Sequence, residues 1–204
     1  MTLVYLLRHG ETAWNAAGNR YCGRTDLPLS DVGLRQAALA ARALAEAPLV
    51  AVYVSSLRRS RETGEAISAL HSTVPIEDTR LLEIDFGAWE GLTVAEIEAN
   101  DPIGRAAWIH DPASSRAGGT GETGREVSDR MQEALHAIAN DHPAAAVAVV
   151  GHSTANRLLL AATLGTPLAN YRRFALDNSS ISLLEMGASV PRLMRFNDVA
   201  HLKP

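Results

Sequence analysis

The chain has 204 residues, 47% of them hydrophobic, with a formal net charge of −4 and a pI near 6.0. This size predicts one domain over residues 1–204, and the acidic balance excludes the broad basic face that binds nucleic acid or anionic membranes. The lone cysteine, Cys22, excludes an internal disulfide, and the longest apolar block, 144–150, is too short to span a membrane. We therefore expect a cytoplasmic protein without a targeting segment.

Short apolar runs alternate with helical patterns in the first part of the chain. An initial run of five apolar residues is too short for a helix and predicts a buried strand that ends at Arg8 and His9. Ser30 is a suitable N-cap for an alanine-rich helix, which Pro48 closes. The β-α-β-α order favours a parallel sheet. Its predicted elements are a strand at 3–7, a helix at 31–47, a strand at 50–54 and a helix at about 58–70.

Prolines and glycines interrupt this alternation over about residues 90–123, which we interpret as a small cap insertion that holds short helices. The pattern then resumes. The strand after the cap ends at His152. The last two strands are joined through Met186-Gly187 and lie at or near a sheet edge. An edge strand there makes a homodimer possible. The predicted elements are a helix at 122–140, a strand at 144–150, a helix to Leu164, and strands at 181–185 and 192–196.

Cationic side chains follow two of the predicted strands. Ligands of open α/β sheets gather at the carboxyl ends of strands, where Arg8, His9 and His152 fall. If the two strands are neighbours, both imidazoles face one pocket. Guanidinium groups donate paired hydrogen bonds to phosphate oxygens, which suits Arg8 and Arg59 to hold a phosphate monoester. The set predicts phosphoryl transfer.

Each of these groups has a role in that chemistry. His9 is the expected nucleophile, because an imidazole with an ordinary pKa of about 6.5 is largely neutral at working pH. His152 is expected to be protonated and to donate to a phosphoryl oxygen. Glu83, with apolar neighbours on both sides, is better suited than Asp85 to protonate the leaving oxygen and later to deprotonate water.

Four motifs occur in order along nearly the whole chain, and together they are more specific than the Arg-His-Gly triplet alone. They are Leu-Leu-Arg8-His9-Gly-Glu-Thr-Ala-Trp-Asn15, Ser55-Ser-Leu-Arg-Arg59-Ser-Arg-Glu-Thr63, Leu-Glu83-Ile-Asp-Phe-Gly-Ala-Trp-Glu-Gly91 and Gly151-His152. With these motifs the chain resembles the histidine phosphatase superfamily, in its cofactor-dependent phosphoglycerate mutase-like branch.

The resemblance implies a fold and a set of roles. The fold is a three-layer α/β/α sandwich with a mostly parallel mixed sheet and a small cap. The reaction proceeds through a phosphohistidine on His9. Arg8, Arg59 and His152 form the phosphate pocket, and Glu83 is the proton donor.

Four further residues match family positions that line the site. Asn15, Cys22 and Gly23 correspond to contacts with phosphate or substrate, although many relatives have Gln or Thr in place of Cys22. Ser153, together with Thr154, stands where many relatives have a glycine pair, so this pair narrows the pocket or adds a hydroxyl donor. A lone cysteine is more often a small apolar filler than a redox switch.

The sequence thus predicts a metal-independent phosphomonoesterase that hydrolyses a small phosphorylated metabolite without a cofactor. A zinc hydrolase is excluded, because guanidinium groups beside the pocket histidines repel a metal dication. Two alternatives stay open: a phosphoglycerate mutase, disfavoured because the mutase insert is missing between Leu92 and Thr120, and a catalytically silent phosphate- or protein-binding module. Phe86 stands where phosphoserine phosphatases of the family have a histidine, which weakens the case for phosphoserine as substrate.

Overall fold

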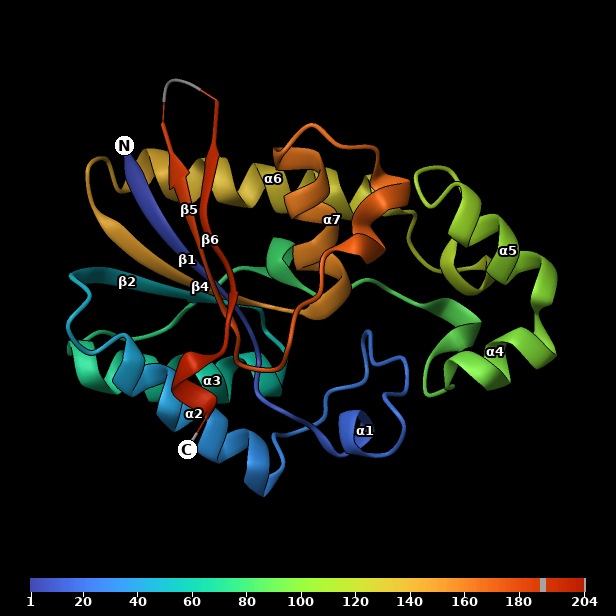
Figure 1. The fold of residues 1–204 in the computed structure, drawn as a ribbon, viewed down its shortest axis with the longest axis horizontal. Coiled ribbons are helices and arrows are strands. Elements are labelled where there is room, and N and C mark those ends of the chain that lie inside the picture. The colour runs from blue at the N-terminus through green and yellow to red at the C-terminus, as the bar shows by residue number, and fades with distance from the viewer. Residues whose placement is uncertain (188–189, 204) are drawn as a thin grey trace.

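A six-stranded sheet forms the centre of the computed structural model, which describes residues 1–187 and 190–203 (Figure 1). The strand order is β3-β2-β4-β1-β5-β6. The first four of these run parallel, β5 is antiparallel to β1, and β6 is antiparallel to β5. The predicted mixed, mostly parallel sheet is therefore confirmed. The strands are β1 (Thr2–Arg8), β2 (Leu49–Val54), β3 (Ile76–Glu77), β4 (Ala146–Gly151), β5 (Ile181–Met186) and β6 (Arg192–Asp198).

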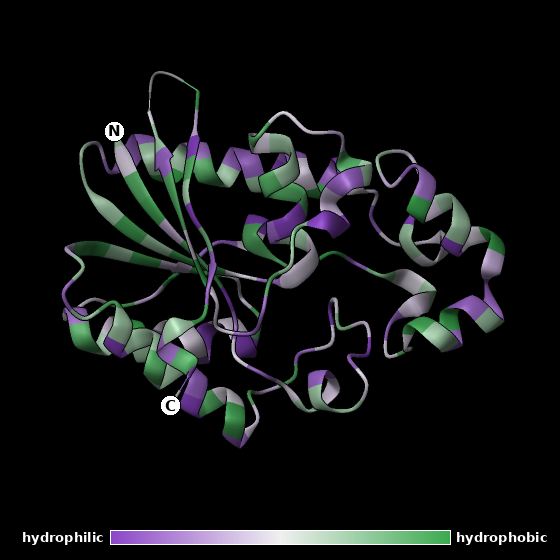
Figure 2. Ribbon diagram, viewed as in Figure 1, coloured by the Kyte–Doolittle hydropathy of each residue, from purple (hydrophilic) through white to green (hydrophobic). Residues whose placement is uncertain are grey.

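Helices cover both faces of the sheet, which gives the predicted three layers (Figure 1). Successive side chains of the inner strands point to opposite faces: Leu6 and Val149 pack into one core, and Leu7 and Val150 pack into the other. Figure 2 reflects this burial: the inner strands are mostly hydrophobic, and the outer helices carry both hydrophobic and hydrophilic residues. The first face carries α6 (Gly124–Asp141) and α7 (Ser153–Thr163), and the second carries α2 (Asp31–Ala43) and α3 (Arg58–His71).

Helix α2 begins where Ser30 predicts, since the Ser30 hydroxyl accepts a hydrogen bond from the Gly33 N–H at 3.1 Å. It ends at Ala43, four residues before the predicted end, because Leu44 and Ala47 close a turn. Strand β4 begins two residues later than predicted, because Ala144 has a φ of 57° and belongs to the preceding turn.

Short helices fill the predicted cap, as expected, and lie beyond the end of the sheet (Figure 1). Asp101 ends the first helix and caps the second by accepting the Gly104 N–H at 2.9 Å, with Pro102 in the first turn. The cap holds α4 (Val94–Asn100), α5 (Pro102–His110) and the 3₁₀ turn η3 (Ala117–Gly119).

Several short elements were not predicted, because each contains too few residues to show a period. These elements are β3 and, in addition, α1 (Ala13–Ala16), η1 (Thr79–Leu81), η2 (Gly87–Trp89), η4 (Leu168–Arg173) and η5 (Ala200–Leu202). The predicted β5–β6 connection lies partly outside the described residues. Within the described part of the chain, no helix has both the length and the apolar character needed to cross a membrane.

Candidate active site

Two neighbouring strands bring His9 and His152 together. Strands β1 and β4 pair in parallel with Arg8 opposite Gly151, so the two histidines follow residues that face each other in the sheet. The backbone N–H of His9 donates to the Gly151 carbonyl at 3.1 Å. The ring centroids lie 5.1 Å apart with planes inclined at 59°. The juxtaposition that the strand ends predicted is thus present in the structure.

The imidazole of His9 is buried and oriented by its own turn. Its Nδ1 lies 2.6 Å from the Gly10 carbonyl oxygen, which can only accept, so Nδ1 carries the proton and Nε2 keeps its lone pair. Burial, together with the positive charges of Arg59 and Arg8, holds the pKa of His9 well below its usual value. His9 is therefore neutral near pH 7, the form that a nucleophile requires.

His152 lies deeper, with both ring nitrogens engaged. Nε2 lies 2.6 Å from the Ser55 hydroxyl at the end of β2, and Nδ1 accepts a hydrogen bond from Arg59 Nε at 3.3 Å. Burial and the charge of Arg59, with a smaller effect of His9, hold the pKa of His152 well below its usual value. This shift favours the neutral imidazole, whereas the predicted protonated form of His152 concerns the state with a phosphoryl group beside it. Ser55 was missed, although it follows β2 as His9 follows β1.

Arg59 is fully buried in α3 and holds the loop of residues 22–25. Its NH1 donates to the Thr25 carbonyl at 2.8 Å, and its NH2 donates to the carbonyls of Gly23 at 2.8 Å and Cys22 at 3.2 Å. On the other side, the Glu90 carboxylate accepts the N–H groups of Gly23 at 2.9 Å and Thr25 at 3.0 Å. The loop is therefore fixed from both sides.

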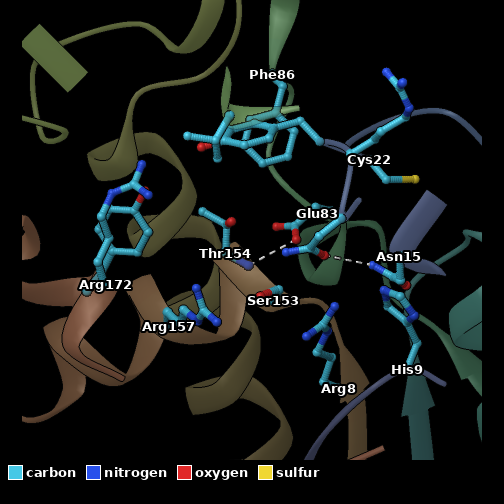
Figure 3. A pocket seen from close by; sticks show the side chains of 15 residues that line it. Arg8, His9, Asn15, Cys22, Glu83, Phe86, Ser153, Thr154, Arg157 and Arg172 are labelled. Atoms are coloured by element: carbon cyan, nitrogen blue, oxygen red, sulfur yellow. Dashed lines mark hydrogen bonds between the residues drawn. The ribbon is translucent and has the colours of Figure 1, made fainter. Parts of the chain in front are cut away.

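Glu83 places a buried carboxylate at the beginning of α7. Its Oε1 accepts the N–H groups of Ile84 at 2.9 Å and Ala155 at 2.8 Å. Its Oε2 accepts the N–H of Thr154 at 3.0 Å, the bond drawn in Figure 3. The helix lacks a side-chain cap from His152, so Glu83 supplies the missing acceptor from a distant part of the chain. Among the described residues Oε2 has one hydrogen-bond partner, which leaves a lone pair for proton transfer.

Arg130 and Glu122 hold the segment that carries Glu83. Arg130 NH1 donates to the carbonyls of Arg80 and Leu82 at 2.7 and 2.6 Å, and NH2 donates to the Glu83 carbonyl at 3.1 Å. Glu122 accepts from Arg130 Nε at 2.9 Å. Although burial acts against ionisation, the hydrogen bonds and charge of Arg130 lower the pKa of Glu122, so this carboxylate is charged.

A cavity of about 140 Å³ opens over these groups. Of the predicted site residues, six line it: Arg8, His9, Asn15, Cys22, Glu83 and Ser153. Arg59, Gly23 and His152 are not among the residues that line it. Lining residues that the sequence analysis missed are Asn19, Arg20, Tyr21, Val94, Arg157, Tyr171 and Arg172, and Thr154 and Phe86 also line it.

Arg157 could have been found from the helical period. It follows Ser153 by four residues and Thr154 by three, so all three share one face of α7, and a pocket that contacts Ser153 also meets Arg157. No comparable pattern marks Arg172, which lies in the unpredicted η4.

Two further predicted site residues, Asn15 and Cys22, differ in their hydrogen bonding and reactivity. Asn15 is oriented by its Oδ1, which accepts from the Thr12 N–H at 3.0 Å and the Asn178 side chain at 3.3 Å. Burial raises the pKa of Cys22 to about 11, so its thiol is neutral and unreactive, in line with a filler. Among residues 1–187 and 190–203, no three His, Cys, Asp or Glu side chains cluster closely enough to hold a metal ion.

A family model described as histidine phosphatase superfamily (branch 1) matches residues 4–199 of this chain. The chain belongs to the histidine phosphatase superfamily. Among its relatives, phosphoserine phosphatase 1 of Hydrogenobacter thermophilus is 32% identical over 202 residues, with 99% of this chain and 95% of the relative covered. A probable phosphoglycerate mutase, GpmB of Proteus mirabilis, is 35% identical over 185 residues, with 91% and 85% covered.

A solved structure extends this similarity to the whole histidine phosphatase fold. Phosphoserine phosphatase from Entamoeba histolytica, in complex with 3-phosphoglyceric acid, superposes with a TM-score of 0.91 at 27% identity, with all of both chains covered. The sequence resemblance to the superfamily and the fold that it implied are therefore confirmed.

Proposed function

We propose that this histidine phosphatase hydrolyses a small phosphorylated metabolite through a phosphohistidine on His9, without a metal ion. The observation that carries the proposal is the orientation of His9, whose neutral ring keeps an Nε2 lone pair beside a cavity that arginines line. Relatives named for phosphatase activity on phosphoserine support hydrolysis of a small phosphate monoester. The chain would work as a single domain.

In the first step His9 Nε2 attacks phosphorus, the P–N bond forms and the ester P–O bond breaks. The protonated Glu83 carboxyl gives its proton to the leaving oxygen from Oε2. In the second step Glu83 takes a proton from water, the water oxygen attacks phosphorus, and the P–N bond breaks. The two steps together release an alcohol and inorganic phosphate, and Glu83 ends protonated.

Positive charge around the phosphoryl group lowers the barrier of both steps. Arg8 has an unpartnered buried Nε within the described structure, which suits it to donate to a phosphoryl oxygen. A dianionic phosphoryl group beside His152 would raise the pKa of that imidazole, so we propose that His152 gains a proton at Nδ1 as substrate binds. Protonation of Nδ1 removes the acceptor of the Arg59 Nε–H, which then becomes available to the same phosphoryl group.

Four other residues shape the proposed phosphate end of the site. Asn15 and Ser153 contact the substrate directly, since both line the cavity. Cys22 fills the wall next to them. Gly23 acts indirectly, because its N–H is bound to Glu90 and its close approach to the Ile84 carbonyl fixes the loop.

Phosphoglycerate mutase activity is the second candidate, favoured by the GpmB relative. A mutase returns the phosphoryl group from His9 to its product, whereas a hydrolase gives it to water. A chain that binds phosphate without catalysis is the third, and the same His9 geometry argues against it.

The test is a screen for phosphate release from phosphorylated metabolites in the presence of a chelator, with 3-phosphoglycerate included. We expect inorganic phosphate rather than 2-phosphoglycerate, a phosphoryl group that is trapped on His9 by rapid denaturation, and neither signal from His9→Ala. His136→Asn, an exposed change on α6, is the control. Activity that requires added divalent metal would overturn the proposal.

A further inference from the structure

The cavity extends beyond the groups assigned to the phosphoryl transfer. Arg157 on α7 and Arg172 at the end of η4 line its far part (Figure 3). In this view Arg157 lies between Arg8 and Arg172, so the three arginines follow one side of the pocket, with His9 at the other end. None of the proposed chemical steps uses Arg157 or Arg172.

Neither arginine has a counter-ion in the described part of the chain. The ion pairs among these residues involve other arginines, and the Nε of Arg157 is buried without a hydrogen-bond partner. Arg20, which also lines the cavity, differs: it donates to Glu96 at 2.9 Å and to the Gly91 carbonyl at 2.8 Å. Arg157 and Arg172 therefore have donors to offer to a ligand, and those of Arg20 are engaged.

The positive charges are close enough to affect one another. Burial, and then the charge of Arg157, lower the pKa of Arg8 to about 10, and burial with the charge of Arg172 among its causes lowers the pKa of Arg157. Glu83 is the one acidic residue that lines the cavity within the described structure. An anion bound here would relieve this excess of like charge.

Arg172 is also oriented before any ligand arrives. Its guanidinium lies 4.9 Å from the centre of the Tyr171 ring, which gives a cation–π contact. The Tyr171 hydroxyl accepts the indole N–H of Trp108 at 2.9 Å, and both aromatic side chains are buried. The ring beneath Arg172 is thus fixed, so less conformational entropy is lost when Arg172 binds a ligand.

We propose that Arg157 and Arg172 form a second anion subsite that binds the leaving-group end of the substrate. The substrate class is then a phosphate monoester of a short alcohol that carries a second anionic group, either a carboxylate or another phosphate. This inference rests on the proposed function, because it needs the phosphoryl group at His9 to set which end of the substrate reaches Arg157. Guanidinium forks bind either anion by paired hydrogen bonds.

The experiment compares substrates that differ in the second anion alone. 3-Phosphoglycerate and glycerol 3-phosphate differ in a carboxylate, and propane-1,3-diol bisphosphate and propanol phosphate differ in a phosphate. In at least one pair, we expect Arg157→Gln and Arg172→Gln to reduce kcat/KM for the substrate that carries the second anionic group by about 10- to 100-fold, mostly through KM. The partner without the second anionic group should change less than about threefold. The pair that responds identifies the anion.

The control and a second variant keep the inference testable. Arg173→Gln changes the next arginine of η4, which is exposed and does not line the cavity, and should have no selective effect. Arg157→Lys should keep part of the selectivity because it keeps the charge. If Arg157→Gln folds poorly, Arg172→Gln still tests the second anion subsite, because Arg172 is exposed and its substitution should not affect folding.

Equal losses on both members of each pair, or no loss on any, would overturn the second subsite. p-Nitrophenyl phosphate separates this result from failure of the proposed function, because it carries no second anion. If the wild-type protein hydrolyses it through a trapped phosphohistidine, but Arg172→Gln has no selective effect within either substrate pair, the subsite alone is wrong. If no phosphohistidine forms, the proposed function is wrong.

Discussion

The guanidinium of Arg59 donates from Nε to Nδ1 of His152 at 3.3 Å, while its other nitrogens donate to carbonyls of the loop of residues 22–25. One buried side chain therefore links the end of β4 to a loop that lies far away in the sequence. The planar fork matters here as much as the charge, because the acceptors lie in several directions.

Arg59→Lys should disrupt this link, since an ammonium cannot reach the imidazole and three carbonyls at once. We expect a loss of about 2–4 kcal/mol in the free energy of unfolding and a decrease of about 100-fold or more in kcat/KM. Urea unfolding and steady-state kinetics measure the two effects. Arg58→Lys changes the adjacent, exposed arginine, which pairs with Glu62 at 2.6 Å, and should be nearly neutral. Equal behaviour of the two variants would contradict this role.

Acid should destabilise the protein through His9 and His152. Both have a lowered pKa in the folded chain, whereas an unfolded histidine titrates near pH 6.5. Below about pH 6.5 the unfolded chain therefore binds protons that the folded chain does not, and stability falls as pH falls. Each histidine contributes a slope of up to about 1.4 kcal/mol per pH unit, and above this window the stability from both is fully present.

The measurement is the free energy of unfolding in urea between pH 5 and 8. His9→Asn and His152→Asn should each flatten the slope, and His136→Asn, exposed on α6, should leave it unchanged. A wild-type stability that stays level or rises on acidification would show that these imidazoles are protonated in the fold.

Arg130 should act on catalysis by positioning Glu83. Arg130→Lys cannot keep hydrogen bonds to three carbonyls, so the carboxylate shifts, and we expect kcat for an alkyl phosphate to fall by about 10- to 100-fold. p-Nitrophenyl phosphate should lose much less, because p-nitrophenolate leaves without a proton. Arg116→Lys, at the exposed pair with Glu126, is the matched control. A uniform loss on both substrates would point to a structural effect alone.

Gly23 should tolerate no side chain, for a reason of space. A β-carbon there would collide with the Ile84 carbonyl oxygen and lie 2.8 Å from Glu90 Oε2, so Gly23→Ala should cost about 1–3 kcal/mol and lower activity by displacing the loop. Gly165→Ala meets no atom within 4 Å and should cost only about 1 kcal/mol for its φ of 65°. Thermal unfolding ranks the two. The reverse ranking would contradict the close packing of the loop.

Much of the fold follows from local pattern. The continuous apolar runs that became β1 and β4 could be read from the sequence, because strands buried on both faces carry apolar residues at every position. The predicted positions of the helix ends were less accurate. Leu44 to Ala47 continue the helical composition of α2, and only the turn before β2 ends the helix there.

The residues of the candidate active site likewise include some that the sequence predicted and some that it could not. Arg8, His9, Glu83 and His152 were found because each interrupts apolar sequence at an element end or carries a motif of the superfamily. Arg172 could not be found, because an arginine in an irregular segment has the same local sequence whether it faces solvent or a cavity. The lowered pKa of His152 could not be predicted, because it depends on burial and on the Arg59 charge, which the sequence does not place.

The amino-acid sequence by itself determined the superfamily, the order of the main helices and strands and the proposed nucleophile, because these depend on residue type and on spacing along the chain. The tertiary structure alone decided that Arg59 holds a loop, that Glu83 caps α7, and that Arg157 and Arg172 face the cavity without a counter-ion among the described residues. The reason is that hydrogen bonds and charge interactions depend on distances across the fold, and those distances exist only after the sheet has paired β1 with β4.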